Sequence, residues 1–115
     1  MPDINFKIIA EDDKTNARIT RWKTNHGTVE TPFYMPCATK MAVKHLTSSD
    51  LKAIGIQAII SNALVLELSR GSRYIEKHGG IHALMNFHGT IFTDSGGFQM
   101  IRESFYERTT ENGVI

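Results

Sequence analysis

The sequence predicts an α/β fold in which an antiparallel β-sheet precedes alternating strands and helices. Three observations support this prediction. The first 31 residues alternate apolar and polar side chains between polar turns, as half-buried antiparallel strands do. Residues 56–60 form a nearly continuous apolar run of strand length, typical of a strand covered on both faces. Helical patterns separate this run from another at residues 90–93, so the two strands are expected to be parallel neighbours.

Length and composition limit the class of protein. The chain has 115 residues, 41% hydrophobic and 22% charged, which allows one globular core or part of one. No apolar run approaches the ~18 residues of a membrane helix, and Met1–Asp3 begins no leader, so we expect a cytoplasmic protein without a membrane partner. The single cysteine, Cys37, excludes an intrachain disulfide and is expected to be a small buried apolar residue.

The N-terminal part is expected to form an antiparallel hairpin or meander of extended segments joined by polar turns. The segments cover residues 4–9, 17–23 and 28–31. Such a sheet buries little apolar surface by itself, so it is expected to cover a larger body. Pro32 and Pro36 then keep the chain extended, and residues 37–45, which show no clear period, are expected to form a loop.

A helix and a buried strand follow the loop. Thr47 and Asp50 have the spacing of a capping box, although Asp replaces the preferred Glu. Gly55 suits the left-handed position that ends a helix. Residues 56–60 are then expected to be a strand that ends at Ser61–Asn62.

Helical segments connect this strand to the next one. Residues 63–77 are rich in leucine and are expected to form one interrupted helix or two short ones. Gly79–Gly80 interrupts the chain again, and residues 81–85 have the apolar spacing of a short helix. Residues 90–93 are the second strand, and a right-handed crossover is expected to place it parallel to the first.

The turn after the second strand is the main candidate for a functional site. Its residues are Asp94, Ser95, Gly96, Gly97 and Phe98. An acid there can lie at the mouth of a cavity, paired glycines let the backbone close around a flat ligand, and the phenyl group offers it a ring face. Because parallel strands end at one edge of a sheet, Asn62 and the loop at 37–44 are expected to converge on this turn. The alternatives are a structural turn whose acid bonds its own backbone, and an asparagine that only caps a helix.

Charge and histidine spacing indicate no specific partner or metal. The 13 Lys and Arg nearly balance the 12 Asp and Glu, which neither requires nor excludes nucleic acid. The grouped basic residues are Lys40, Lys44, His45, Arg70, Arg73 and Arg102. They would hold phosphates if they met on one face, and otherwise form an ordinary solvated surface. His78 and His82 have a zinc-like spacing, but the Gly79–Gly80 between them argues against a metal site.

The end of the sequence indicates part of a larger unit. Val114–Ile115 are apolar β-formers directly after the turn-forming Asn112–Gly113, as if a new strand were beginning. About three parallel strands with an open edge would also leave unpaired backbone and a large apolar face.

Five segments, in order along the chain, resemble the N-terminal part of the tRNA-guanine transglycosylase family. They are Thr31–Pro36, Ile60–Asn62, Gly79–His82 with Leu84–Asn86, Thr93–Met100 and Thr110–Val114. The run Thr-Asp-Ser-Gly-Gly-Phe-Gln in the fourth is specific to that family. The resemblance implies the N-terminal portion of a (β/α)8 TIM barrel, with residues 1–31 as antiparallel strands ahead of it and residues 32–115 as its first βα units. Members exchange a guanine in tRNA for a 7-deazaguanine base: preQ1, queuine or the archaeosine precursor preQ0.

The resemblance also implies roles for the matched residues. Asp94 matches the acid that hydrogen-bonds the exchanged base and handles its proton as general acid and base. Phe98 matches the aromatic side chain that stacks on that base. Ser95–Gly97 match the rest of the base-binding turn, and Asn62 matches an asparagine near the ribose.

Other parts of the family's site are implied to lie outside this chain. The nucleophilic aspartate that attacks the ribose C1′ and the zinc ligands come later along the barrel, so this chain is expected to hold no cofactor and to be inactive alone. It would need a chain that completes the barrel, or a dimer partner. Ala63–Val65 replace the more polar Thr-Tyr-His of the bacterial pattern, which leaves the base and the tRNA position open. The alternative is a non-catalytic accessory subunit that binds tRNA, and the retention of Asp94 favours the enzyme.

Overall fold

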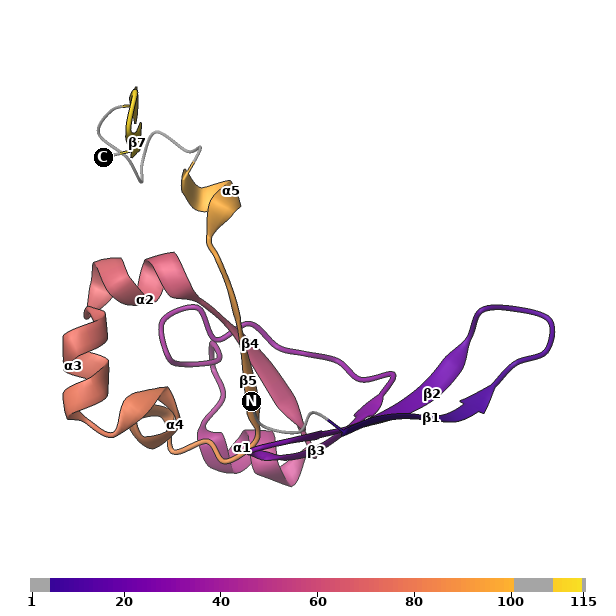
Figure 1. The fold of residues 1–115 in the computed structure, drawn as a ribbon. Coiled ribbons are helices and arrows are strands. Elements are labelled where there is room, and N and C mark those ends of the chain that lie inside the picture. The colour runs from indigo at the N-terminus through magenta and orange to yellow at the C-terminus, as the bar shows by residue number, and fades with distance from the viewer. Residues whose placement is uncertain (1–4, 101–108, 115) are drawn as a thin grey trace.

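The computed structural model describes residues 5–100 and 109–114, and its strands form three sheets within these ranges (Figure 1). The antiparallel sheet β1-β2-β3 consists of β1 (Asn5–Glu11), β2 (Arg18–Thr24) and β3 (Gly27–Thr31). The parallel pair is β4 (Ala58–Asn62) with β5 (Thr90–Asp94), and the short antiparallel pair is β6 (Thr109–Thr110) with β7 (Gly113–Val114). The predicted α/β class, with an antiparallel N-terminal sheet and parallel neighbours after it, is confirmed.

Helices follow or separate these strands. They are α1 (Ser48–Ala53), α2 (Ala63–Ser69), α3 (Ser72–Lys77), α4 (Gly80–Met85) and α5 (Gly97–Met100). All but α5 lie in positions that the sequence predicts; α5 begins inside the segment that was expected to be a turn. The leucine-rich segment is two short helices rather than one, because Gly71 adopts φ +84° between them. α4 ends at Asn86, which is left-handed with φ +49°. None of the helices in the described ranges is long and apolar enough to cross a membrane.

The N-terminus of α1 has the predicted capping box. The backbone N–H of Asp50 donates to Oγ1 of Thr47 over 3.2 Å, and the backbone N–H of Thr47 donates to Oδ2 of Asp50 over 2.8 Å. The hydrogen bond from the Thr47 hydroxyl also holds the pKa of Asp50 below its ordinary value. An aspartate therefore closes the box as a glutamate would. Gly55 follows the helix with φ +75°, as predicted.

The first parallel strand begins at Ala58, two residues later than predicted, because the backbone N–H of Ile56 still donates to the carbonyl of Leu51 in α1 over 2.9 Å. The side chain of Gln57 contacts another sheet. Its Oε1 accepts from the backbone N–H of Glu30 over 2.9 Å, and its Nε2 donates to the carbonyl of Glu30 over 3.2 Å. The side chain of Gln57 thus pairs with the free edge of β3. On its other edge, away from β5, β4 pairs with the Pro36–Ala38 segment through the backbone of Ile60.

A small core surrounds β4. It consists of Ala38, Leu51, Ile59, Met85 and Phe87, all buried. The remaining apolar surface is spread out, and Phe6 and Ile8 on β1 are 54% and 51% exposed. The radius of gyration is 17.1 Å, whereas a compact chain of this length would have about 13 Å. Figure 1 shows the reason: the β1–β2 hairpin projects from one side and α5 with the C-terminal pair from another.

Cys37 is exposed, so the prediction of a buried cysteine is wrong. The backbone of this segment runs alongside β4, with Cys37 opposite Ile60 in a parallel bridge. Side chains alternate between the two faces of such an extended segment. Ala38, with 0% exposure, takes the inward position, which directs the thiol of its neighbour outward.

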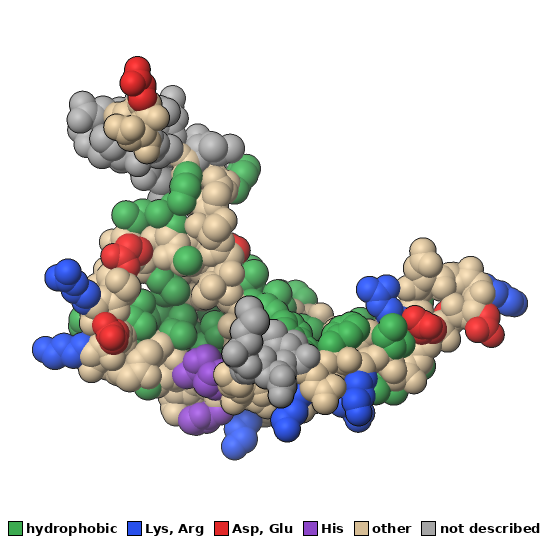
Figure 2. All heavy atoms as spheres, viewed as in Figure 1, with side chains coloured by type: hydrophobic (Ala, Val, Ile, Leu, Met, Phe, Trp, Pro, Cys, Tyr) green, Lys and Arg blue, Asp and Glu red, His purple; other side chains and the backbone are tan. Residues whose placement is uncertain are grey.

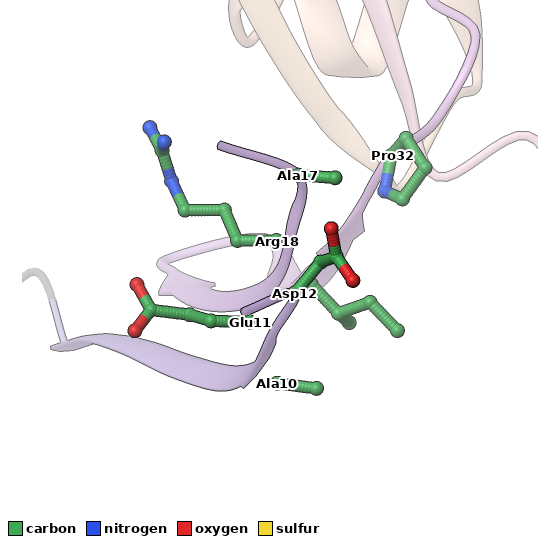
Figure 3. Close-up of a pocket in the computed structure, with 7 residues that line it drawn as sticks. Ala10, Glu11, Asp12, Ala17, Arg18 and Pro32 are labelled. Atoms are coloured by element: carbon green, nitrogen blue, oxygen red, sulfur yellow. The ribbon is translucent and has the colours of Figure 1, made fainter. Parts of the chain in front are cut away.

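The N-terminal sheet is attached to the parallel pair by ring and hydroxyl contacts. Trp22 of β2 packs on Phe92 of β5 with ring centroids 5.3 Å apart, and Oγ1 of Thr24 lies 2.9 Å from Oγ1 of Thr90. The far end of the hairpin does not take part in this attachment. It forms a groove of about 500 Å³ that is lined by Ala10, Glu11, Asp12, Ala17, Arg18, Ile19 and Pro32 (Figure 3).

Candidate functional site

Asn62 and Asp94 lie opposite each other at the carboxyl ends of the parallel strands. The Nδ2 atom of Asn62 donates to Oδ1 of Asp94 over 2.7 Å. Asn62 is 4% exposed, whereas Asp94 lies on the surface. The predicted convergence of these two residues is therefore confirmed. The pairing follows from the parallel register, which sets residue 58 opposite residue 90 and carries Asn62 to Asp94.

The turn after β5 is held closed by the carboxylate that begins it. Oδ1 of Asp94 accepts from the backbone N–H of Gly96 over 2.7 Å, so the acid does bond its own backbone. Gly96 has φ +74°, and a Cβ atom there would lie 2.6 Å from Cβ of Leu64 and 2.8 Å from Oδ1 of Asn62. Glycine is required at this position both for the backbone angle and for the close packing against the start of α2.

The two carboxylate oxygens of Asp94 differ. Oδ1 accepts from both Asn62 and Gly96, while Oδ2 accepts no hydrogen bond from residues 5–100 or 109–114. The hydrogen bonds to Oδ1 fix the orientation of the carboxylate, and Oδ2 keeps its capacity to accept a further hydrogen bond. Such a group can accept an N–H from a ligand or exchange a proton with it.

Asn62 also caps α2, which confirms the structural alternative predicted for it. Its Oδ1 accepts from the backbone N–H of Val65 over 2.9 Å. The cap fixes the orientation of the side-chain amide and directs its NH2 group to Asp94. One residue thus joins the start of a helix to the candidate acid.

Gln99 is a further member of the site that the sequence reasoning did not single out. Its Oε1 accepts from Nδ2 of Asn62 over 3.2 Å. The signal was present in the sequence, because Gln99 belongs to the same family-specific run as Asp94. An amide placed five residues after the acid, just past a glycine turn, is in a position to reach back to the strand ends.

The other predicted residues lie around this network. Ser95 is exposed, Gly97 begins α5, and Phe98 on α5 is 62% exposed. The loop at 37–44 is tied to β4 through the hydroxyl of Ser61, which donates to the carbonyl of Ala38 over 2.6 Å.

The grouped basic residues do not form one patch on the face shown in Figure 2, where Lys and Arg side chains are scattered along the edges. Lys40, Lys44, His45 and Arg73 are exposed, and Arg70 lies over the ring of Tyr74 at 5.8 Å. Arg102 lies outside the described residues. The described part of the chain therefore gives no support to a phosphate site at these residues and agrees with the alternative of an ordinary solvated surface.

The two histidines with zinc-like spacing have separate environments. The ring of His82 stacks on that of His26 with centroids 3.6 Å apart, and its Nε2 lies 3.1 Å from the carbonyl oxygen of Gly89. Burial lowers the pKa of His82, and the charges of His26 and His88 add to this effect. Nδ1 of His78 lies 2.8 Å from the carbonyl oxygen of Tyr74. Within the described ranges, no three His, Cys, Asp or Glu side chains gather closely enough to hold a metal ion.

Comparisons with known proteins agree with the resemblance carried by the motifs. The family model described as queuine tRNA-ribosyltransferase matches residues 12–115. Proteins named queuine tRNA-ribosyltransferase are 44% identical in Thermoanaerobacter pseudethanolicus, 42% in Caldanaerobacter subterraneus and 40% in Solibacter usitatus. These matches cover 99%, 99% and 100% of this chain.

The same matches cover 30%, 30% and 31% of the relatives, so the chain spans slightly less than a third of their length. The match begins at the hairpin and runs through the turn after β5, so it includes Asn62, Asp94 and Gln99. The chain belongs to the queuine tRNA-ribosyltransferase family, the pentosyltransferases also called tRNA-guanine transglycosylases.

Proposed function

We propose that this chain supplies the base-binding acid of a tRNA-guanine transglycosylase. Residues 1–31 are its N-terminal antiparallel strands, and residues 32–115 are the first βα units of a (β/α)8 barrel that other residues complete. One observation carries the proposal: the Asp94 carboxylate is fixed through Oδ1 at the carboxyl end of a parallel strand, and its Oδ2 accepts no hydrogen bond from the residues that the structure describes. The carboxyl ends of barrel strands are where such enzymes hold their reacting groups.

The proposed chemistry exchanges one base for another at the ribose C1′ of a tRNA guanosine. A carboxylate outside this chain forms a bond to C1′ as the bond from C1′ to guanine breaks, and guanine leaves with a proton. The incoming 7-deazaguanine base then gives up a proton as it bonds to C1′ and releases the carboxylate. Asp94 gives the first proton and takes the second, so it ends each cycle as it began.

The residues around Asp94 are placed to hold the acid and the base that it would bind. Gly96 lets the turn pack closely against Leu64 and Asn62, and the exposed Gly97 leaves room for a flat base beside the backbone. Phe98 on the surface of α5 supplies the stacking ring. Ser95 belongs to the same base-binding turn. Asn62 holds the acid and lies beside the ribose.

Activity is proposed for the completed barrel and not for this chain alone, since the nucleophile and the zinc ligands lie elsewhere. The partners are tRNA, a 7-deazaguanine base and the remaining part of the barrel. The accessory-subunit alternative is not favoured, because the relatives that match 99% of the chain are named as ribosyltransferases.

The test uses this chain joined to the remaining residues of the Thermoanaerobacter pseudethanolicus relative. Labelled guanine entering tRNA measures the exchange. Asp94→Asn keeps an oxygen for the bonds from Asn62 and Gly96 but cannot transfer the proton, so we expect the rate to fall by about 100- to 10,000-fold. The melting temperature should stay within about 2 °C of the unchanged protein.

Asp12→Asn is the matched control. Asp12 is an exposed aspartate at the far end of the hairpin whose carboxylate accepts from the hydroxyl of Thr15 over 2.6 Å. The same change of charge there should leave exchange unaltered. Wild-type exchange in Asp94→Asn would remove Asp94 from the mechanism, and failure of the joined protein to exchange any base would favour the accessory subunit.

A further inference from the structure

The orientation of the Asn62 amide follows from the donors and acceptors around it. The backbone N–H of Val65 is an obligatory donor, so the side-chain atom 2.9 Å away must be the amide oxygen. The NH2 group therefore lies on the other side. One of its hydrogens goes to Oδ1 of Asp94 at 2.7 Å and the other to Oε1 of Gln99 at 3.2 Å.

Gln99 completes this arrangement from a different element. It lies on α5, which begins at Gly97 in the glycine turn. Its bond to Asn62 connects α5 back to the end of β4, across the turn that carries Asp94. With Val65, Asp94 and Gln99 all engaged, the buried amide of Asn62 has no freedom to rotate.

We propose that Gln99 is a positioning residue for Asp94, acting through the side-chain amide of Asn62. The inference rests on the proposed function, because it concerns the acid that the exchange reaction would use. Loss of the Gln99 acceptor frees one N–H of Asn62 and loosens the amide, which weakens the hold of Asn62 on Oδ1 of Asp94 and leaves the Gly96 N–H as its remaining fixed donor among the described residues. The acid then spends less time in the geometry that proton transfer requires.

Two substitutions separate positioning from simple support of the fold. Gln99→Met has nearly the same length without the acceptor, and we expect exchange kcat to fall by about 10- to 100-fold with KM for tRNA unchanged. Gln99→Glu keeps the acceptor but adds a negative charge. The oxygens of residues 94 and 99 lie within about 6 Å of each other, since both contact one nitrogen. A like charge at this distance favours protonated Asp94, so the limb of the pH–rate profile that Asp94 sets should move to higher pH.

The experiment measures pH–rate profiles of exchange in the joined protein for the wild type, Gln99→Glu and Gln99→Met. Gln57→Glu makes the same chemical change at the opposite end of the strands and should leave the profile in place. An upward shift in Gln99→Glu, together with retained exchange, supports positioning.

Failure of this inference is distinguishable from failure of the proposed function. If Asp94→Asn abolishes exchange while Gln99→Glu leaves the profile unmoved and Gln99→Met keeps the wild-type kcat, the function stands and the role of Gln99 is wrong. If Asp94→Asn exchanges at the wild-type rate, the proposed function itself is wrong. A carbon-13 titration of the Asp94 carboxyl group in the same proteins gives a reading that does not depend on activity, and an unchanged titration in Gln99→Glu overturns the inference.

Discussion

Both ends of the β4–β5 pair carry polar residues, but these residues have different partners. Those at the amino end bond to the N-terminal sheet, and those at the carboxyl end bond to each other. At the amino end, Gln57 and Thr90 bond to Glu30 and Thr24 of the N-terminal sheet, and Thr90 is buried. At the carboxyl end, Asn62 donates to Asp94, which lies at the surface. The difference shows how a strand pair can be attached to another sheet at its amino end and remain accessible to a ligand at its carboxyl end.

A glycine permits close packing at each end, but against different neighbours. A Cβ atom at Gly89 would lie 2.6 Å from the carbonyl oxygen of Gln57 and 2.7 Å from the ring of Phe87. A Cβ atom at Gly96 would meet Leu64 and the side chain of Asn62. Packing at the amino end therefore supports the core, while packing at the carboxyl end supports the turn of the acid.

The largest effect that would separate the two ends is expected from alanine at these glycines. Gly96→Ala forces the turn away from Asn62, and we expect exchange in the joined protein to fall by at least about 100-fold, as a displacement of about 1 Å can cause. Gly89→Ala should instead reduce the free energy of unfolding by about 1–3 kcal/mol through overpacking, with normal exchange per folded molecule. Urea unfolding and the exchange assay measure both. Equal losses of activity in the two variants would show that the ends are not functionally distinct.

A smaller effect is expected at the attachment of β3. Gln57→Leu removes both hydrogen bonds to the backbone of Glu30, and we expect a loss of about 1 kcal/mol in stability. The amide of Glu30 should also exchange its hydrogen with solvent faster. Gln99→Leu is the matched control, since it changes a glutamine at the other end and should not alter exchange at Glu30. Unchanged protection of that amide in Gln57→Leu would mean that the sheet is held by other contacts.

The smallest effect is expected from acid at the stacked histidines. The pKa of His82 is below its ordinary value of 6.5 because the ring is buried and faces His26 and His88. The neutral ring is thus favoured by the fold, and its contribution to stability is fully present above pH 6.5 and decreases as the pH falls through that value toward the lowered pKa. His26→Phe keeps a ring in the stack without the charge and should reduce this dependence. Fluorescence of Trp22, the single tryptophan, reports the change, and an equal acid response in His26→Phe would contradict it.

Much of the fold was predictable because local signals agreed with the final structure. The capping box at Thr47, the left-handed Gly55 and the apolar run before Asn62 specify their elements through short-range chemistry. The start of β4 was misplaced because the apolar pattern does not show that the backbone N–H of Ile56 bonds to the carbonyl of Leu51 in α1. The exposure of Cys37 was missed for a similar reason, as it depends on which face of the segment turns to β4.

The sequence predicted that Asn62 and Asp94 would lie close together, but not which further residues they contact. The parallel register was enough to bring Asn62 to Asp94. The bond from Gln99 required knowledge of how sharply Gly96 turns the chain, which the left-handed angle alone does not give. The resemblance pointed to the residues, and the geometry added which of them contact one another.

The outward thiol of Cys37 has a practical consequence. As the single cysteine of the chain, it can carry one spectroscopic probe without any substitution, on the extended segment that borders β4. With a second probe on the remaining part of a joined protein, the distance between the two probes could be measured. Its distribution would report directly whether the two parts close around each other.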